Sequence, residues 1–152
     1  MEKKLTHQDG RGRAGMVDVG GKAVVRRRAV AVGEFRAAPG TLDLVIAGTL
    51  PKGEALSVAR VAGVMAGKGC GGLIPLCHPL PVEFVNVSFE RTALDTLTVT
   101  GEAGITAKTG VEMEALTAVS VACLTLFDMT KAVDQELRIE GVRVVEKAKG
   151  GV

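Results

Sequence analysis

Two residues of opposite charge, Asp128 and Lys131, lie three positions apart near the end of the longest helical pattern in the chain. Residues at this spacing share one face of a helix, so the carboxylate and the ammonium could form an ion pair or exchange a proton. A solvated ion pair at a helix end explains the same spacing. On spacing alone the surface ion pair is the favoured interpretation, and the alternative is that Asp128 and Lys131 are an acid and a base.

Two carboxylates, Glu112 and Glu114, stand at the start of the same helical pattern. Glu112 follows Thr109 by three positions, which is the spacing of a capping box at a helix N-terminus. The helix dipole also favours an acidic residue there, so Glu112 has a purely structural explanation. Glu114 has no such explanation, because it follows Met113 in an apolar segment with no obvious partner. Glu114 is the stronger candidate for a functional carboxylate.

A third group of candidates lies in residues 69–81, where glycine and proline are too dense for a helix or a central strand. Prolines at positions 75, 79 and 81 restrict the backbone on both sides of His78. Such a loop holds a side chain in place, so His78 is either a functional residue or an ordinary solvated histidine.

The three cysteines, Cys70, Cys77 and Cys123, do not indicate a disulfide framework. Their number is odd, and Cys123 falls on the expected core face of the long helix. Cys70, Cys77 and His78 could suggest zinc, but they do not form a paired C-x-x-C pattern. A metal site is the weaker interpretation of this loop.

The elements that must position these residues can be predicted from the periodicity of apolar side chains. In residues 107–133 the apolar side chains recur every three or four positions, which predicts a helix that begins near Gly110. The expected core face of this helix consists of Leu116, Val119, Ala122, Cys123, Leu126, Met129 and Val133.

Alternating and turn patterns predict the rest of the chain. The predicted elements are a strand at 22–35, helices at 39–47 and 54–67, a hairpin of strands at 82–90 and 94–101, and a last strand at 136–146. With the long helix, this order predicts an α+β fold of the ferredoxin-like, split βαβ type, with an antiparallel sheet and helices on one face. Because valine is frequent, we expect another subunit on the open face.

The length of 152 residues predicts one domain. Residues 1–21 lack periodicity and are expected to form a flexible N-terminal arm. The single ferredoxin-like domain is expected to span residues 22–147, and residues 148–152 to form a flexible tail.

The composition argues against two classes of partner. A net charge of +2, no Trp or Tyr and four Phe leave little with which to grip or stack nucleic acid. The sequence has no apolar run that we would expect to span a bilayer and no secretion signal at its start, so we expect a soluble cytoplasmic protein.

Three segments together carry a resemblance to a known family. They are 73–80 (Leu-Ile-Pro-Leu-Cys-His-Pro-Leu), 108–118 (Lys-Thr-Gly-Val-Glu-Met-Glu-Ala-Leu-Thr-Ala) and 127–132 (Phe-Asp-Met-Thr-Lys-Ala). With them the chain closely resembles the cyclic pyranopterin monophosphate synthase family, whose members catalyse the second step of molybdenum-cofactor biosynthesis. The match extends to His7, to residues 16–19 and to Lys52-Gly53.

The resemblance implies a lyase reaction in which 3′,8-cyclo-7,8-dihydro-GTP becomes cyclic pyranopterin monophosphate and pyrophosphate is released. It also implies a homohexamer, a trimer of dimers, with active sites where subunits meet. It implies catalytic roles for Asp128, Lys131 and Lys52. The substrate-binding positions that it implies are Leu76, Cys77, His78, Glu112, Met113, Glu114, Lys68, Arg27 and Lys147.

No cofactor and no metal-ligand residues are implied, although Mg²⁺ commonly accompanies a triphosphate. Two rival functions remain at this point. One is a non-catalytic ferredoxin-like oligomer that binds a nucleotide or a protein. The other is a metal-dependent hydrolase that uses Cys77 and His78.

Overall fold

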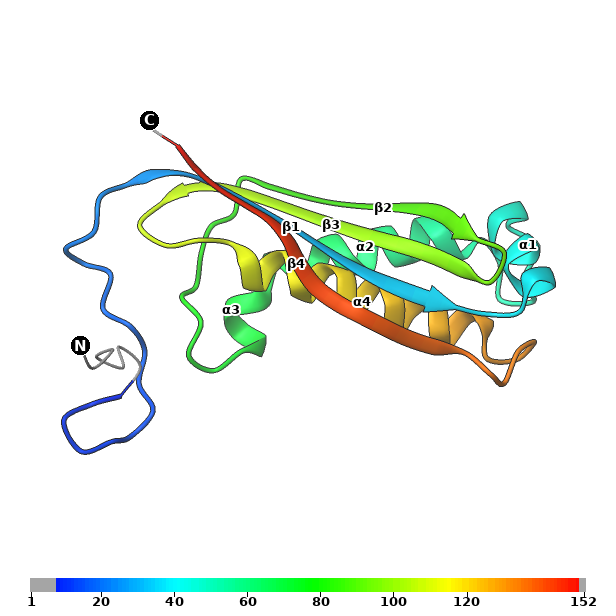
Figure 1. Ribbon diagram of the computed structural model, residues 1–152, viewed down its shortest axis with the longest axis horizontal. Helices are drawn as coiled ribbons and strands as arrows, with labels where there is room; N and C mark the ends of the chain where they lie inside the picture. Colours follow the sequence, from blue (N-terminus) through cyan, green and yellow to red (C-terminus); the bar gives the residue numbers. More distant parts are fainter. Residues whose placement is uncertain (1–7, 151–152) are drawn as a thin grey trace.

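Alternation of small apolar and polar side chains makes β1 (Val25–Arg36) an inner strand of a four-stranded sheet (Figure 1). The computed structural model describes residues 8–150 of the chain. The strands lie in the order β2-β3-β1-β4, and every neighbouring pair is antiparallel. The other elements are α1 (Pro39–Ala47), α2 (Ala55–Lys68), α3 (Cys70–Leu73), β2 (Phe84–Ala93), β3 (Thr96–Ala107), α4 (Glu112–Thr130) and β4 (Arg138–Gly150).

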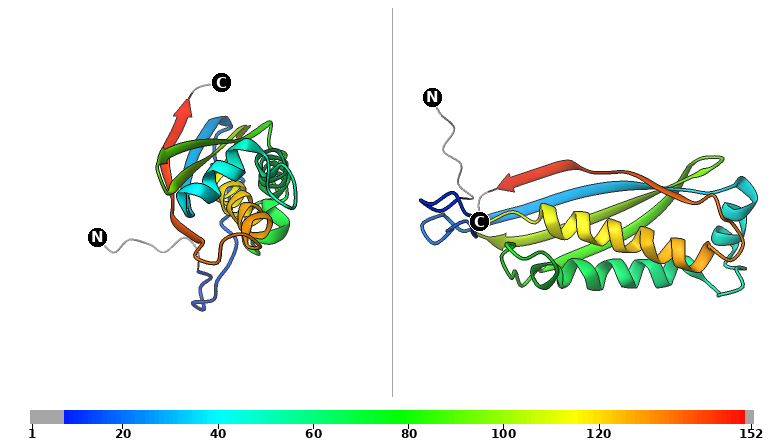
Figure 2. Two further views of the ribbon diagram at one scale, coloured as in Figure 1. Left: turned by 90° about the vertical axis from the view of Figure 1, so that its right-hand side faces the viewer. Right: turned by 90° about the horizontal axis from the view of Figure 1, so that it is seen from below.

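This topology confirms the predicted ferredoxin-like α+β fold. β3 lies between β1 and β2, which is the split βαβ arrangement. Helices α2 and α4 run along one face of the sheet, as the end-on and lower views of Figure 2 show. α1 lies beyond one end of the strands, next to the hairpin of β2 and β3.

The opposite face of the sheet is largely polar. Arg28 lies there between two carboxylates, Glu102 and Glu146, and forms an ion pair with each. Most of the exposed large apolar side chains lie elsewhere, and those on the helical layer include Val58, Val61, Met65 and Leu124. The helical face therefore offers another subunit a more apolar surface than the open face of the sheet does.

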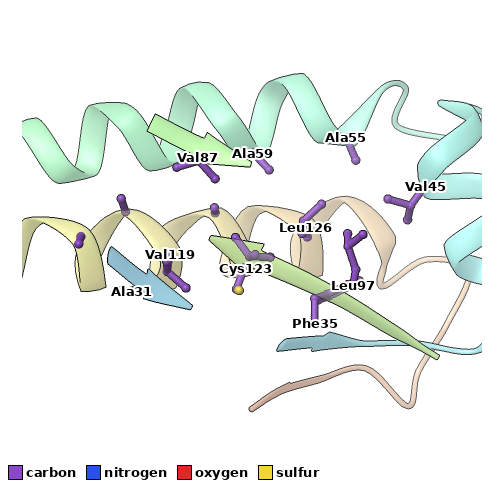
Figure 3. Close-up of a cluster of buried hydrophobic side chains, with 14 of the residues drawn as sticks. Ala31, Phe35, Val45, Ala55, Ala59, Val87, Leu97, Val119, Cys123 and Leu126 are labelled. Atoms are coloured by element: carbon purple, nitrogen blue, oxygen red, sulfur yellow. The ribbon is translucent and has the colours of Figure 1, made fainter. Parts of the chain in front are cut away.

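α4 forms the centre of the core, between the sheet and α2 (Figure 3). Five of the seven residues predicted for its core face are buried: Val119, Ala122, Cys123, Leu126 and Met129. Leu116 is only partly buried. Val133 lies beyond the end of the helix and is 40% exposed, so its predicted core role is wrong.

By length and composition alone, α4 could span a membrane. Half of its apolar window is buried inside the domain. Its apolar character is explained by packing against the sheet and α2.

Several boundaries differ from the predictions because tertiary pairing extends the elements. β3 continues to Ala107 and β4 to Gly150, each held by β1, so β4 passes the predicted domain end at residue 147. The glycine- and proline-rich loop contains one helical turn, α3, which local hydrogen bonds complete. The predicted capping box does not form, since the residue before α4 is Val111 and its side chain makes no cap.

The predicted N-terminal arm is only partly covered by the structure. His7 lies outside the described residues. Residues 8–21 include a backbone bridge between Gln8 and Ala14, and the stretch around residues 17–20 contacts the domain. These contacts place part of the arm beside the candidate site described below.

Close packing of α2 on α4 gives a first prediction, at Gly63. A Cβ atom there would lie 2.7 Å from the Ala118 carbonyl oxygen and 2.8 Å from Val87 Cγ2. We expect Gly63→Ala to lower the free energy of unfolding by about 1–3 kcal/mol, as overpacking does. Urea denaturation followed by circular dichroism measures this change.

Gly40, in α1, is the matched control because a Cβ atom there would meet nothing within 4 Å. Gly40→Ala should leave the free energy of unfolding unchanged or raise it by up to ~1 kcal/mol through helix propensity. Equal stability of the two variants would contradict the close-packing account.

Candidate active site

A pocket of about 300 Å³ lies at the N-terminal end of α4. The loop that follows α3 and the first turn of α4 form two of its walls. All six predicted substrate-binding residues on these segments line it: Leu76, Cys77, His78, Glu112, Met113 and Glu114. The other lining residues are Leu80, Thr109, Gly110 and three residues near the N-terminus. The structure thus brings the two distant motifs together at one pocket.

Glu114 is the most unusual group in the pocket, because it is a carboxylate that is only 4% exposed. Burial raises its pKa, and the nearby Glu112 charge adds to this, while its own backbone hydrogen bond and His78 act in the opposite direction. The side chain has no ion-pair partner among residues 8–150. A buried, unpaired carboxylate is costly to the fold and well suited to accept hydrogen bonds from a ligand.

Glu112 is in a different electrostatic environment. Partial burial opposes its ionisation, but Lys147 Nζ lies 2.8 Å from Oε1, and Arg27 is also nearby, so the pKa of Glu112 falls below its ordinary value. Arg27 donates a hydrogen bond of 3.2 Å to the Lys108 carbonyl oxygen. Lys147 and Arg27 therefore bring two cations to the rim of the pocket next to Glu112.

His78 and Cys77 present two different polar groups to the pocket. His78 Nε2 lies 2.7 Å from the Val17 carbonyl oxygen. A carbonyl only accepts hydrogen bonds, so Nε2 carries a proton and donates it to Val17. Burial raises the pKa of the Cys77 thiol to about 11, with Cys70 and Glu114 adding to the effect. Cys77 is thus a protonated thiol at neutral pH.

A second charged cluster lies at the other end of α4. Asp128 Oδ1 is 2.7 Å from Lys131 Nζ, which confirms that the predicted pair is in contact. Asp128 Oδ2 is 2.9 Å from Lys52 Nζ, which also donates to the Asp128 carbonyl oxygen at 3.0 Å. Hydrogen bonds from Lys131 and then Lys52 lower the pKa of Asp128 to about 2. One exposed carboxylate thus orders two lysine side chains.

The two clusters do not meet within one chain. Glu114 and Asp128 are separated by most of the length of α4, which corresponds to roughly 20 Å at a rise of about 1.5 Å per residue. Lys68 belongs to the pocket end, where it lines an adjoining hollow that shares Leu80 with the pocket. The predicted catalytic residues and the predicted binding residues therefore occupy opposite ends of the molecule.

Sequence reasoning missed the third wall of the pocket. Val17 and Val19 line it although they belong to the predicted flexible arm, and Lys22 lines it although it was predicted to begin the first strand, which starts at Val25. The Met-Val-Asp-Val segment at 16–19 was noted as part of a family resemblance, but its pattern alone gave no sign of a contact with His78.

No metal centre is evident in the part of the chain that the structure describes. Among residues 8–150, no group of three or more His, Cys, Asp or Glu side chains is arranged to hold an ion. With a raised pKa, the Cys77 thiol is also poorly suited as a ligand, because metals bind the thiolate.

The fold and this pocket define an α+β protein with a polar pocket at the end of its central helix. The chain matches the MoaC family over residues 16–150 and belongs to it. It is 55% identical over 146 residues to a cyclic pyranopterin monophosphate synthase of Novosphingobium aromaticivorans, covering 96% of this chain and 92% of the relative.

Two further relatives carry similar names. A cyclic pyranopterin monophosphate synthase of Herpetosiphon aurantiacus is 53% identical over 147 residues, covering 96% of this chain and 90% of the relative. Cyclic pyranopterin monophosphate synthase 3 of Mycobacterium tuberculosis is 51% identical over 146 residues, covering 96% and 82%.

The Asp128 cluster gives a second prediction. Because the folded pKa is lowered, the ion pairs are fully present above the ordinary value of 3.8 and are lost as pH falls through about 2. A ¹³C NMR titration should place the Asp128 carboxyl midpoint near 2, and Lys131→Met should move it toward 3.8. Lys149→Met, at the other end of the molecule, should leave it unchanged. A midpoint near 4 in the unmodified protein would contradict the clustered geometry.

The buried Glu114 gives a third prediction. Its folded pKa is raised, so the folded state holds the proton to higher pH than the unfolded state does, and stability falls as pH rises through the folded pKa. Glu114→Gln should therefore be at least as stable as the parent protein at pH 7 and should lose this pH dependence. Urea denaturation at pH 4 and pH 7 measures both effects. Marked destabilisation of Glu114→Gln at pH 7 would contradict the account.

Proposed function

We propose that this chain acts as a cyclic pyranopterin monophosphate synthase, a lyase that converts 3′,8-cyclo-7,8-dihydro-GTP to cyclic pyranopterin monophosphate and pyrophosphate. Membership of the MoaC family and the names of the relatives support this activity. The observation that carries the proposal is Glu114, which lies in a pocket beside Cys77 and His78 and is buried with no ion-pair partner in the described part of the chain.

The pocket suits a guanine-derived ring. The amino and imino groups of such a ring are donors, and the Glu114 carboxylate accepts hydrogen bonds from them. Leu76 and Met113 supply apolar contacts for the flat ring. The Cys77 thiol is protonated, so it donates a weak hydrogen bond and adds no negative charge beside the ring.

The cations at this end suit the triphosphate. Lys147 and Arg27 lie beside Glu112, and Lys68 borders the adjoining hollow. Arginine and lysine bind phosphate oxygens through charge-assisted hydrogen bonds. Because charge builds on the leaving oxygens as pyrophosphate departs, these cations stabilise the transition state more than the bound substrate.

Asp128, Lys131 and Lys52 suit the proton transfers. Opening the purine ring and closing the pterin ring both require an acid and a base. Asp128 is ionised at neutral pH and holds the two ammonium groups about a single carboxylate. In this arrangement a lysine donates the proton, and the carboxylate orients that lysine and stabilises its charged form.

A single site that contains both groups of residues requires two chains, because α4 keeps the groups apart within one chain. A substrate in the pocket of one subunit does not reach Asp128 of the same subunit, roughly 20 Å away along the helix. We propose that Asp128, Lys131 and Lys52 of a second subunit complete the site. A homohexamer built as a trimer of dimers provides such contacts, and the exposed Val58, Val61, Met65 and Leu124 offer an apolar surface for them.

The chemistry of the substrate also supports a cellular location. A nucleotide-derived intermediate of cofactor synthesis is made and used inside the cell, so we place the protein in the cytoplasm. Mg²⁺ would arrive with the triphosphate as its counter-ion, and no step is assigned to it. Neither nucleic acid nor a membrane is required as a partner.

Two rival functions make different demands on the residues. A binding module of the same fold would need the pocket but has no use for the Lys52, Asp128 and Lys131 cluster. A hydrolase with zinc on Cys77 and His78 would need a thiolate at Cys77, and the raised pKa of that group disfavours one.

The test is turnover of purified protein with 3′,8-cyclo-7,8-dihydro-GTP, following pyrophosphate and the cyclic pyranopterin phosphate together. Both products should appear, and Lys131→Ala should lower kcat by about a hundredfold or more, as loss of a proton donor does. Lys131→Ala should still bind the substrate in calorimetry. Binding without pyrophosphate release by the unmodified protein would favour the binding module. Activity that depends on stoichiometric zinc would favour the hydrolase.

A further inference from the structure

The segment of residues 16–22 forms one wall of the pocket and is fastened to the domain at two points. His78 Nε2 donates to the Val17 carbonyl oxygen at 2.7 Å. Lys108 Nζ donates to the Gly20 carbonyl oxygen, also at 2.7 Å. Val17 and Val19 contribute to the lining of the pocket. A segment without helix or strand is thus held against the site by two long-range hydrogen bonds.

Local hydrogen bonds within the segment also fix its backbone conformation. Asp18 Oδ1 accepts a hydrogen bond of 2.8 Å from the Gly20 amide, and the Lys22 amide donates one of 3.0 Å to the Val19 carbonyl oxygen. Two consecutive local turns are therefore closed before the chain enters β1. They fix the position from which the Lys22 side chain lines the pocket.

Lys22 is a cation of the pocket for which the described residues provide no ion-pair partner. Glu112 is paired with Lys147, and Glu114 forms no ion pair in the described part of the chain. The Lys108 ammonium is occupied by the Gly20 carbonyl oxygen. Lys22 is exposed, lines the pocket and makes no ion pair with any of residues 8–150. Its ammonium is therefore available to an anionic group of a ligand.

We infer that Lys22 is a further substrate-binding residue, which contacts the phosphates of the substrate, and that Lys108 is the positioning residue that holds the wall carrying it. The inference rests on the proposed function for the identity of the substrate. It assigns Lys108 no contact with the substrate. The ammonium of Lys108 acts on the Gly20 carbonyl oxygen, two residues before Lys22, and the backbone turn transmits that constraint.

The first experiment is steady-state kinetics of Lys22→Met with 3′,8-cyclo-7,8-dihydro-GTP. Loss of one charge-assisted hydrogen bond to phosphate should raise KM about ten- to a hundredfold while kcat changes by about threefold or less. Arg11→Met is the matched control, since it removes one positive charge from the same N-terminal segment but lies outside the pocket. Its KM should equal that of the unmodified protein.

The second experiment separates positioning from general structure. Lys108→Met should raise KM in the same direction as Lys22→Met, and Lys108→Arg, which keeps a donor, should restore most of the affinity. The double variant Lys22→Met/Lys108→Met should be no worse than Lys22→Met within about threefold, because both changes remove the same contact. Trypsin should cleave after Lys22 faster only in Lys108→Met.

The outcomes are distinguishable from a failure of the proposed function. If the unmodified protein releases no pyrophosphate, the proposed function fails. If it turns over normally and Lys22→Met has an unchanged KM, the inference about Lys22 is overturned. Additive effects of the two substitutions, or no rescue by Lys108→Arg, would overturn the positioning role of Lys108.

Discussion

The close approach of α2 to α4 is the constraint on which the rest of the structure depends. It is made by small residues, with Gly63 and Gly67 of α2 against Ala118 and Ala122 of α4. A Cβ atom at Gly63 would lie 2.7 Å from the Ala118 carbonyl oxygen, and one at Gly67 would lie 2.9 Å from Val85 Cγ1, so a larger side chain at either glycine would force its neighbours to move. α4 lies between α2 and the sheet, and the side chains on both of these faces are buried. Because α4 is held in this way, its two ends cannot approach each other, and Glu114 stays far from Asp128 within one chain.

The two ends of α4 differ in their electrostatics, and each suits a different task. At the N-terminal end, Glu114 is buried with no cation paired to it among residues 8–150, which weakens the fold and leaves an acceptor for a ligand. At the C-terminal end, Asp128 is exposed and held by Lys131 and Lys52, so it stays charged at all physiological pH values. One end is arranged to recognise a molecule, and the other to keep ammonium groups in a defined place. The proposed site between two subunits would use both ends.

Much of this arrangement could be predicted from the sequence, because periodicity and local spacing carry it. The element order, the Asp128–Lys131 contact and the pairing of the 73–80 loop with the start of α4 in one site all follow from patterns within a few residues or from the family resemblance. The contacts that could not be predicted join distant segments. Lys52 reaches Asp128, Lys147 takes Glu112 away from its expected capping role, and His78 holds Val17. Nothing local to these residues encodes their partners. The ends of β3 and β4 were missed for the same reason, since pairing with β1 and not propensity sets them.

The central claim is that one chain supplies the pocket and another supplies Asp128, Lys131 and Lys52. The most direct measurement is complementation between two inactive variants, Lys131→Ala and Glu114→Gln, produced separately and co-expressed with different tags. In mixed oligomers, random pairing should give intact sites at about a quarter of all positions, so about a quarter of the parent activity should return. If the mixed oligomers are isolated and remain as inactive as each variant alone, both groups act within one chain and the account is contradicted.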